Sequence, residues 1–253
     1  MALSKNEIKY LRSLAQKKYR QKYNKFVVEG DKLAREILAD QRYQVDAVYA
    51  LAEWTEQNRQ QLWEFPAPVY SITPKELARI SNLKTPNQVF VVANQQTFTL
   101  KPQVLKKRVC LYLDAIRDPG NLGTILRIAD WFGIPYVFRS ADSVELYSPK
   151  VIQASMGAFL RVESPELSLE ELVKAFPGTS VYGAAMSGRS IYEISPLSQG
   201  IIVIGNEGSG ISQDNLTYIE QLITIPKGRG GGAESLNAAV ATGIICALVA
   251  RSW

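Results

Sequence analysis

The second half of the chain holds polar residues and glycines that follow directly on apolar runs. The polar residues are Asn121, Arg127, Glu207, Ser235 and Asn237. Glycine lets backbone N–H and C=O groups approach a ligand, because it has no side chain to hold the ligand off. A helix start adds unpaired N–H donors. In α/β sheets ligands bind at the carboxyl ends of strands, so the pattern predicts a pocket built from loops. For the glycine-rich segment 227–234 taken alone, a flexible turn before a packed helix is the alternative.

These residues fall into three segments with the same order of strand, loop and helix. The segments are 109–127, 201–212 and 223–248. Their similarity to a known family is carried by Asn121-x-Gly123-x3-Arg127, Gly205-Asn-Glu207-x2-Gly210-Ile-Ser212 and Ile225-Pro226 … Glu234-Ser235-Leu236-Asn237. In this order they resemble the motifs of the SpoU/TrmH family of RNA ribose 2′-O-methyltransferases. The segment from Ile225 to Ser235 is slightly longer than the family pattern, which leaves the register of its contacts open.

The resemblance implies that S-adenosylmethionine binds bent in a C-terminal trefoil knot. Main-chain groups near Gly205, Ile225 and Leu236 would contact its adenine and ribose, with Asn206 and Ala184 close by. Packing at strand ends is a second role that the apolar positions can fill at the same time. The sulfonium is already an activated leaving group, so the chemistry requires no metal.

Arg127 lies off the apolar stripe of its helix. We expect it to serve the reaction because Asn121 and Gly123 stand before it at the spacing of the family that the motifs resemble. The family resemblance implies a part in activating the ribose hydroxyl. Because the pKa of arginine is too high for an ordinary base, holding the phosphate and the nucleophile is the safer role. Asn121 and Glu207 are expected to fix the loops, and Ser235 and Asn237 to start the last helix as cap and ligand contact. A purely structural role for Glu207 and a solvated position for Arg127 are the alternatives.

The first 25 residues are strongly basic, with eight Lys or Arg against Glu7 alone. A basic segment of this kind is typical of a surface that binds nucleic-acid phosphates. A helix whose charges face only solvent is the alternative. The expected RNA contacts are Lys5, Lys9, Arg12, Lys17, Lys18 and Arg20, with Arg229 from the glycine loop.

Five aromatic residues of the first half are either further candidates for RNA contact or core residues. Tyr10, Tyr19 and Tyr23 can stack on bases, whereas Trp54 and Trp63 are interpreted as core residues.

Composition excludes several other chemistries. The chain has 253 residues, 46% of them hydrophobic, and no histidine. Because the chain has no histidine, catalysis by an imidazole is not expected. Cys110 and Cys246 lie in apolar runs, so a zinc site is not expected either. No apolar run reaches the ~20 residues of a membrane span, and the basic start lacks a signal segment. We therefore expect a cytoplasmic protein without a metal.

Alternating strand and helix patterns predict an α/β fold with two domains. Residues 1–95 are expected to form a basic helix and a small RNA substrate-binding domain, 96–107 a linker, and 108–253 a methyltransferase domain with a parallel sheet. The knot comes from the resemblance alone, since general rules count against knots.

The leading hypothesis is a homodimeric RNA 2′-O-methyltransferase that uses S-adenosylmethionine. The fused first domain favours ribosomal RNA over tRNA. A tRNA methyltransferase, a base methyltransferase and a non-catalytic RNA-binding assembly factor on the same fold remain alternatives.

Overall fold

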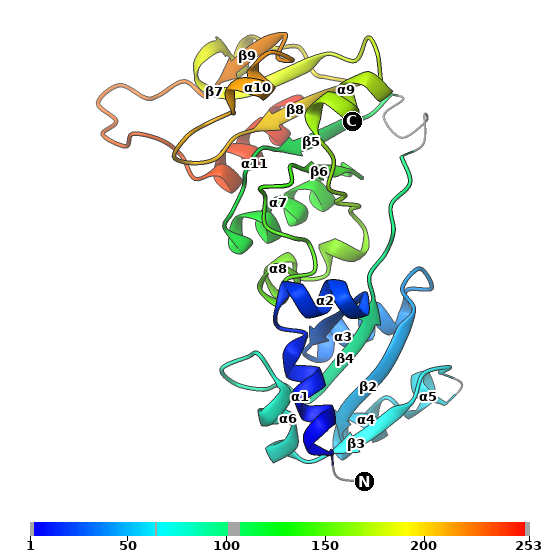
Figure 1. The fold of residues 1–253 in the computed structure, drawn as a ribbon. Coiled ribbons are helices and arrows are strands. Elements are labelled where there is room, and N and C mark those ends of the chain that lie inside the picture. Colours follow the sequence, from blue (N-terminus) through cyan, green and yellow to red (C-terminus); the bar gives the residue numbers. More distant parts are fainter. Residues whose placement is uncertain (1–2, 64, 101–106, 251–253) are drawn as a thin grey trace. The chain divides into compact units, whose positions relative to one another are not determined.

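The computed structural model describes residues 3–63, 65–100 and 107–250, and the chain divides into two compact units (Figure 1). Unit 1 runs to Thr97 and includes Tyr147–Leu160, and unit 2 holds Phe98–Leu146 and the chain from Arg161 onward. Residues 101–106 of the predicted linker lie outside the described residues, so the predicted domain bounds stay a prediction. No helix within the described ranges is long and apolar enough to cross a membrane.

Unit 1 is a four-stranded mixed sheet with helices on both faces. Its elements are α1 (Lys5–Ser13), α2 (Lys17–Tyr23), β1 (Lys25–Glu29), α3 (Asp31–Ala39), β2 (Val45–Leu51), α4 (Ala52–Gln57), α5 (Arg59–Leu62), β3 (Val69–Ile72), α6 (Pro74–Ile80), β4 (Val89–Asn94) and α8 (Pro149–Ser155). The strand order is β1-β4-β2-β3, in which β4 runs antiparallel to both neighbours and β2 pairs with β3 in parallel. One face packs on Ile8 and Leu11 of α1 and on Leu77 and Ile80 of α6.

The segment 147–160 belongs to unit 1 although unit 2 flanks it in the sequence. Gln153 Nε2 donates to the Glu29 carbonyl at 2.8 Å, and the Phe159 ring meets Phe26 edge to face at 5.9 Å. The sequence pattern predicts a helix over 148–157 but places it with the second domain. Its actual neighbours are set by contacts with β1, which the pattern does not show.

Unit 2 is a five-stranded parallel sheet, so the predicted α/β class with a parallel sheet is confirmed. Its elements are β5 (Val109–Leu113), α7 (Pro119–Trp131), β6 (Val137–Arg139), α9 (Leu169–Ala175), β7 (Val181–Ser190), β8 (Gly200–Ile204), α10 (Gln213–Leu216), β9 (Gln221–Thr224) and α11 (Ala238–Val249). The strand order β6-β5-β8-β7-β9 places the loops after β5, β7, β8 and β9 at one edge. The trefoil knot stays a prediction.

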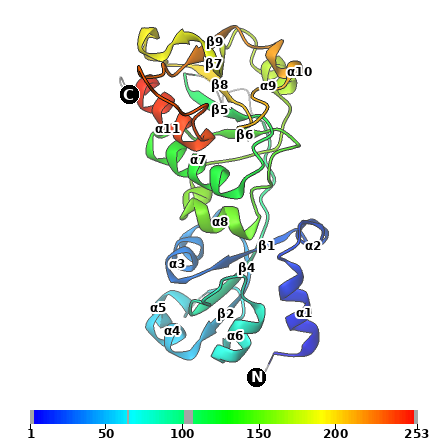
Figure 2. The ribbon, with the colours of Figure 1, turned by 90° about the vertical axis from the view of Figure 1, so that its left-hand side faces the viewer.

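Helices cover both faces of this sheet, with α7 and α11 side by side on one face and α9 and α10 on the other (Figure 2). Cys110 and Tyr112 of β5 pack against Leu169 and Leu172 of α9. Because strand side chains alternate, Leu111 and Leu113 point to the α7–α11 face, where they too are buried. α7 begins where Asp118 Oδ1 accepts from the Asn121 N–H at 2.8 Å, with proline at its first position.

Candidate active site

A cavity of about 740 Å³ lies at the carboxyl edge of the unit 2 sheet. Its lining comes from the ends of β7, β8 and β9, from the loops after β8 and β9, and from the start of α11. Most side chains around it are apolar or small, and the volume lies within the ~300–1,000 Å³ of small-molecule sites. The predicted cofactor positions all line it, namely Ala184, Gly205, Asn206, Ile225 and Leu236.

The loop after β8 is closed by a two-bond hairpin. Asn206 N donates to Gly210 O at 3.0 Å, and Gly210 N donates to Asn206 O at 2.9 Å. Asn206 Oδ1 accepts from Gly208 N, and its Nδ2 donates to Ala115 O, both at 2.9 Å. A Cβ on Gly205 would lie 2.3 Å from the Gly210 carbonyl carbon, so glycine is required for this closure. The hairpin is a preformed wall of the cavity.

Side chains of the three sequence motifs meet in one hydrogen-bonded chain. Asn121 Nδ2 donates to Glu207 Oε1, and Asn237 Nδ2 donates to Asn121 Oδ1 at 2.8 Å. Asn237 Oδ1 in turn accepts from Ala239 N at 3.0 Å and from Val240 N at 3.2 Å, which caps α11. The structure therefore brings Asn121, Glu207 and Asn237 together. Asn121 lies in the middle and links Glu207 to Asn237.

The loop from Ile225 to Ser235 leaves much of its backbone without partners. Within the described residues, the stretch 226–236 makes one main-chain hydrogen bond of its own, from Gly231 N to Gly228 O at 3.2 Å. Ser235 and Leu236 are exposed and line the cavity. Main-chain donors and acceptors of this loop are thus available to a ligand, as backbone recognition of a cofactor requires.

Two arginines predicted to serve the reaction or the RNA lie outside the cavity lining. Arg127 is exposed and has no hydrogen-bond or ion-pair partner among the described residues. It lies six residues after Asn121, which is ~9 Å along α7. Arg229 is also exposed, and its neighbours Gly228 and Gly231 line the cavity while its own side chain does not.

Most of the predicted RNA contacts of the first 25 residues are exposed, but one is not. Lys5, Lys9, Arg12, Lys17 and Lys18 are exposed. By contrast, Arg20 is 3% exposed, and its Nη1 donates to the Leu14 carbonyl at 2.7 Å. Desolvation on burial lowers the pKa of Arg20 to about 10. Arg20 therefore closes the turn between α1 and α2, and its guanidinium is not presented to RNA.

Three contributors to the site do not stand out in the sequence. Met186, which is 67% exposed, lines the cavity. Lys227 lines it as well. Asp114, which is 4% exposed, holds the loop after β8, because its Oδ2 accepts from Ser212 N at 2.7 Å. Asp114 and Lys227 follow closely on β5 and β9, and this position is the signal that could have found them. Met186 lies within β7 and carries no such signal.

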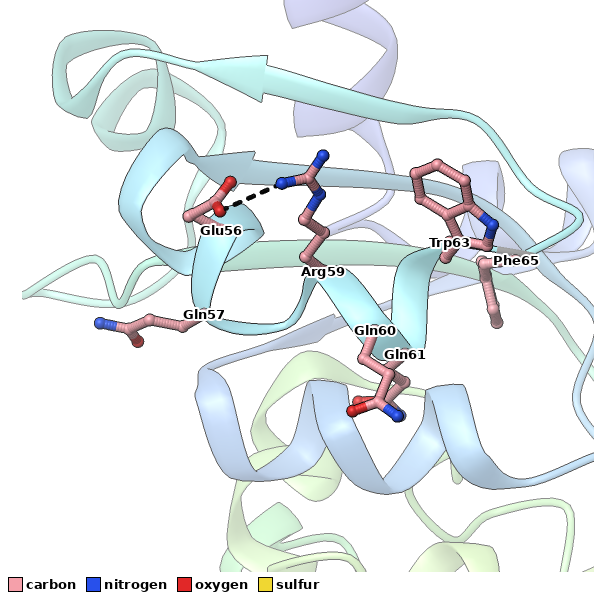
Figure 3. Close-up of a pocket in the computed structure, with 7 residues that line it drawn as sticks. All are labelled: Glu56, Gln57, Arg59, Gln60, Gln61, Trp63 and Phe65. Atoms are coloured by element: carbon pink, nitrogen blue, oxygen red, sulfur yellow. Dashed lines mark ion pairs between the residues drawn. The ribbon is translucent and has the colours of Figure 1, made fainter.

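A second hollow, of about 750 Å³, lies on unit 1 around α5 (Figure 3). Its side chains diverge: Gln60 and Gln61 point away from Trp63, and Arg59 pairs with Glu56 at 3.6 Å. The interpretation of Trp63 as a core residue is wrong, since it is 74% exposed. Without convergent polar groups this hollow is a weaker candidate than the cavity of unit 2.

Metal and thiol chemistry find little support in the geometry. In the part of the chain that the structure describes, no three His, Cys, Asp or Glu side chains are grouped to hold a metal ion. Burial raises the pKa of Cys246 to about 12 and raises that of Cys110 as well, so both thiols are protonated at neutral pH.

Comparison with known proteins identifies the class and then the family. The model of the SpoU rRNA Methylase family matches residues 108–247, and that of the MRM3-like substrate binding domain matches residues 5–91. The chain is thus of the class in which an RNA methylase domain is fused to a substrate-binding domain. It belongs to the SpoU rRNA Methylase family, which confirms the resemblance seen in the sequence.

Several relatives are similar over nearly the whole chain. The 23S rRNA (guanosine(2553)-2′-O)-methyltransferase RlmP of Bacillus subtilis is 28% identical over 96% of this chain and 95% of its own. An RNA methyltransferase of the TrmH family from Porphyromonas gingivalis is 38% identical, with a TM-score of 0.85 over 98% of both chains. The AdoMet-bound rRNA methyltransferase of Sinorhizobium meliloti is 26% identical, with a TM-score of 0.87 over 99% of this chain and 97% of its own.

Proposed function

We propose that this protein transfers a methyl group from S-adenosylmethionine to the 2′-hydroxyl of a ribose in ribosomal RNA. The observation that carries the proposal is the cavity at the carboxyl edge of the unit 2 sheet, which the Glu207–Asn121–Asn237 chain borders through Glu207. Family membership and full-length relatives named as rRNA methyltransferases support it.

The residues around the cavity suit this cofactor. Apolar side chains such as Ile204 and Leu222 offer surface to an adenine ring, and the unpaired backbone of 226–236 offers donors and acceptors to its polar edge. Gly205, Ile225 and Leu236 supply main-chain groups there, with Ala184 and Asn206 beside them. When bound, the sulfonium supplies an activated methyl group that needs no metal.

The polar residues position the reaction. Asn121, Glu207 and Asn237 hold the loops in register, and the Ser235 hydroxyl is placed to contact the bound molecules. The exposed guanidinium of Arg127 takes a phosphate of the RNA and so aligns the ribose oxygen with the methyl group. The chain's part in catalysis is mainly alignment.

We further propose a homodimer formed through unit 2. α11 carries no charged residue along Ala238–Val249, and a helix that is apolar all round is normally covered. Yet Val240 is 51% exposed, and Trp131 of the adjacent α7 is 85% exposed. A second copy would cover this surface. We also propose a cytoplasmic location, because the relative named as an rRNA methyltransferase in Bacillus subtilis acts in a bacterium, whose ribosomes lie in the cytoplasm.

Calorimetry with S-adenosylmethionine separates the proposal from its main rival. A methyltransferase binds the donor with about one site per chain, whereas a non-catalytic RNA-binding assembly factor has no need of it. A protein that binds rRNA and gives no heat with the donor would favour the rival. Incubation with either rRNA or tRNA and labelled donor then decides between the two RNA classes.

A further inference from the structure

Three tyrosines at the start of unit 1 have rings that contact one another. Tyr19 and Tyr23 lie one turn apart on α2, with ring centroids 6.3 Å apart and planes at 14°. Tyr10 of α1 meets Tyr23 edge to face at 5.1 Å. Tyr23 is 37% exposed, and the other two are half-buried. These three residues form what we call the tyrosine cluster.

Two lysines of α2 lie over the rings of this cluster. Lys18 Nζ is 5.9 Å from the Tyr19 ring centroid, and Lys22 Nζ is 5.4 Å from that of Tyr23. Both lysines are exposed, and neither has an ion-pair partner among the described residues. The surface therefore combines aromatic rings with uncompensated positive charge.

The carboxylate nearest to the cluster is Asp46, which acts on Tyr10 and is ion-paired with Lys25. Within the described residues neither Lys18 nor Lys22 is ion-paired with a carboxylate, so both ammonium groups are available to an anion. An anion that also has flat apolar faces fits this surface best.

We propose that the tyrosine cluster, with Lys18 and Lys22, is a platform on which unpaired bases of the substrate RNA stack. The inference rests on the proposed function and names the form of RNA that unit 1 takes, a single-stranded loop or bulge. Bases in a duplex are stacked on each other and do not offer free faces, whereas splayed bases stack on aromatic side chains. The lysines bind the adjoining phosphates.

The test measures binding of the full-length protein to a labelled short oligouridylate and to an RNA duplex, by fluorescence anisotropy over a range of salt. Replacing Tyr19 and Tyr23 by leucine weakens oligouridylate binding by about 5–150-fold for each lost stack. Tyr19→Phe with Tyr23→Phe keeps the rings and the affinity. Lys18→Gln instead makes the negative slope of log K against log salt shallower by about 0.7.

Controls separate this inference from folding defects and from the proposed function. Trp63→Leu removes an aromatic ring of the same unit that is 74% exposed and leaves the affinity unchanged. The single variant Tyr23→Leu, at the most exposed ring, serves if the double variant melts at a lower temperature. S-adenosylmethionine binding, measured by calorimetry, stays at the wild-type value in every variant, so a failure of the donor site would appear there alone.

Two results would overturn the platform. One is wild-type oligouridylate affinity in the leucine variants. The other is an equal loss for oligouridylate and duplex, which would assign the surface to phosphates without stacking.

Discussion

Asn237 Nδ2 donates a hydrogen bond to Asn121 Oδ1 at 2.8 Å across 116 residues of sequence. It ties the first turn of α7 to the N-cap of α11, so two helix starts meet beside Glu207, which lines the cavity. The positive end of each helix dipole faces the same region. Glu207 contacts Asn121 from the second motif, and its carboxylate lies where these partial positive charges favour it.

This contact predicts measurable coupling between the two asparagines. In a double-mutant cycle of Asn121→Ala and Asn237→Ala, we expect about 0.5–1.5 kcal/mol of coupling in the free energy of unfolding, measured by urea denaturation. The Gln44–Asn94 pair of unit 1, also exposed and 2.9 Å apart, is the matched control. Both pairs should couple in stability, but only the pair of unit 2 should weaken S-adenosylmethionine binding. Additive effects at Asn121 and Asn237 would contradict the link.

The hairpin after β8 predicts a sharp difference between two glycines of one loop. Gly205→Ala places a Cβ 2.3 Å from the Gly210 carbonyl carbon, so the loop must open, and donor affinity should fall at least ~10-fold. Gly208→Ala meets only the Asn206 side-chain oxygen at 3.5 Å and should bind the donor as wild type. Calorimetry measures both. Equal affinities in the two variants would show that the hairpin does not shape the site.

Arg127 is predicted to act on the reaction and not on cofactor binding. Its side chain has no partner within the described residues, so Arg127→Ala should melt at the wild-type temperature and keep its affinity for the donor. Loss of the phosphate contact should lower the methylation rate by about 10²-fold or more. Lys227→Ala removes a different positive charge, one that lines the cavity, and tests whether the loss of any cation has this effect. Normal turnover of Arg127→Ala would remove the residue from the reaction.

Much of the fold could be read from local patterns. Apolar periodicity and capping patterns predict strands over Val45–Leu51 and Val109–Leu113 and a helix over Asp31–Ala39, and β2, β5 and α3 have these bounds. The capping-box spacing at Ser4 also predicts one helix from there to about Arg20, but the structure has two, α1 and α2. The break arises where Arg20 reaches back to the Leu14 carbonyl, a contact that periodicity does not encode.

The site shows the same division between local and long-range information. Motif order led to Asn121, Glu207 and Asn237, but their hydrogen-bonded chain spans distant segments and could not be derived from spacing. Met186 was missed because the long β7 strand bulges between Ala184 and Arg189, which both pair with Ile223. Partners far apart in sequence decide such details.

The capping box of α6 predicts acid sensitivity of unit 1. Hydrogen bonds from the Thr73 backbone N–H, the Thr73 hydroxyl and the Leu3 N–H lower the pKa of Glu76 to about 2. Because the folded pKa lies below the unfolded value of 4.5, the stabilisation is complete above pH 4.5 and is lost as the pH falls towards 2. Thermal melts should show Glu76→Gln less stable than wild type above pH 4.5 and converging with it in acid.

The matched control for this prediction is Glu53→Gln on α4. Glu53 is exposed, and among the described residues its carboxylate accepts a hydrogen bond only from the Gln57 amide, at 3.4 Å. The melting temperature of Glu53→Gln should match that of wild type at every pH. A stability difference for Glu76→Gln that stays constant from pH 7 to 2 would rule out the capping carboxylate as the cause.

The most direct measurement follows the label from [methyl-³H]S-adenosylmethionine into ribosomal RNA that is digested to nucleosides. We expect label in a 2′-O-methylated nucleoside with the wild-type protein and with Gly208→Ala, and at least ~10-fold less label with Gly205→Ala when the donor concentration lies below the wild-type Kd. Label in a methylated base, or equal transfer by both glycine variants, would contradict this expectation.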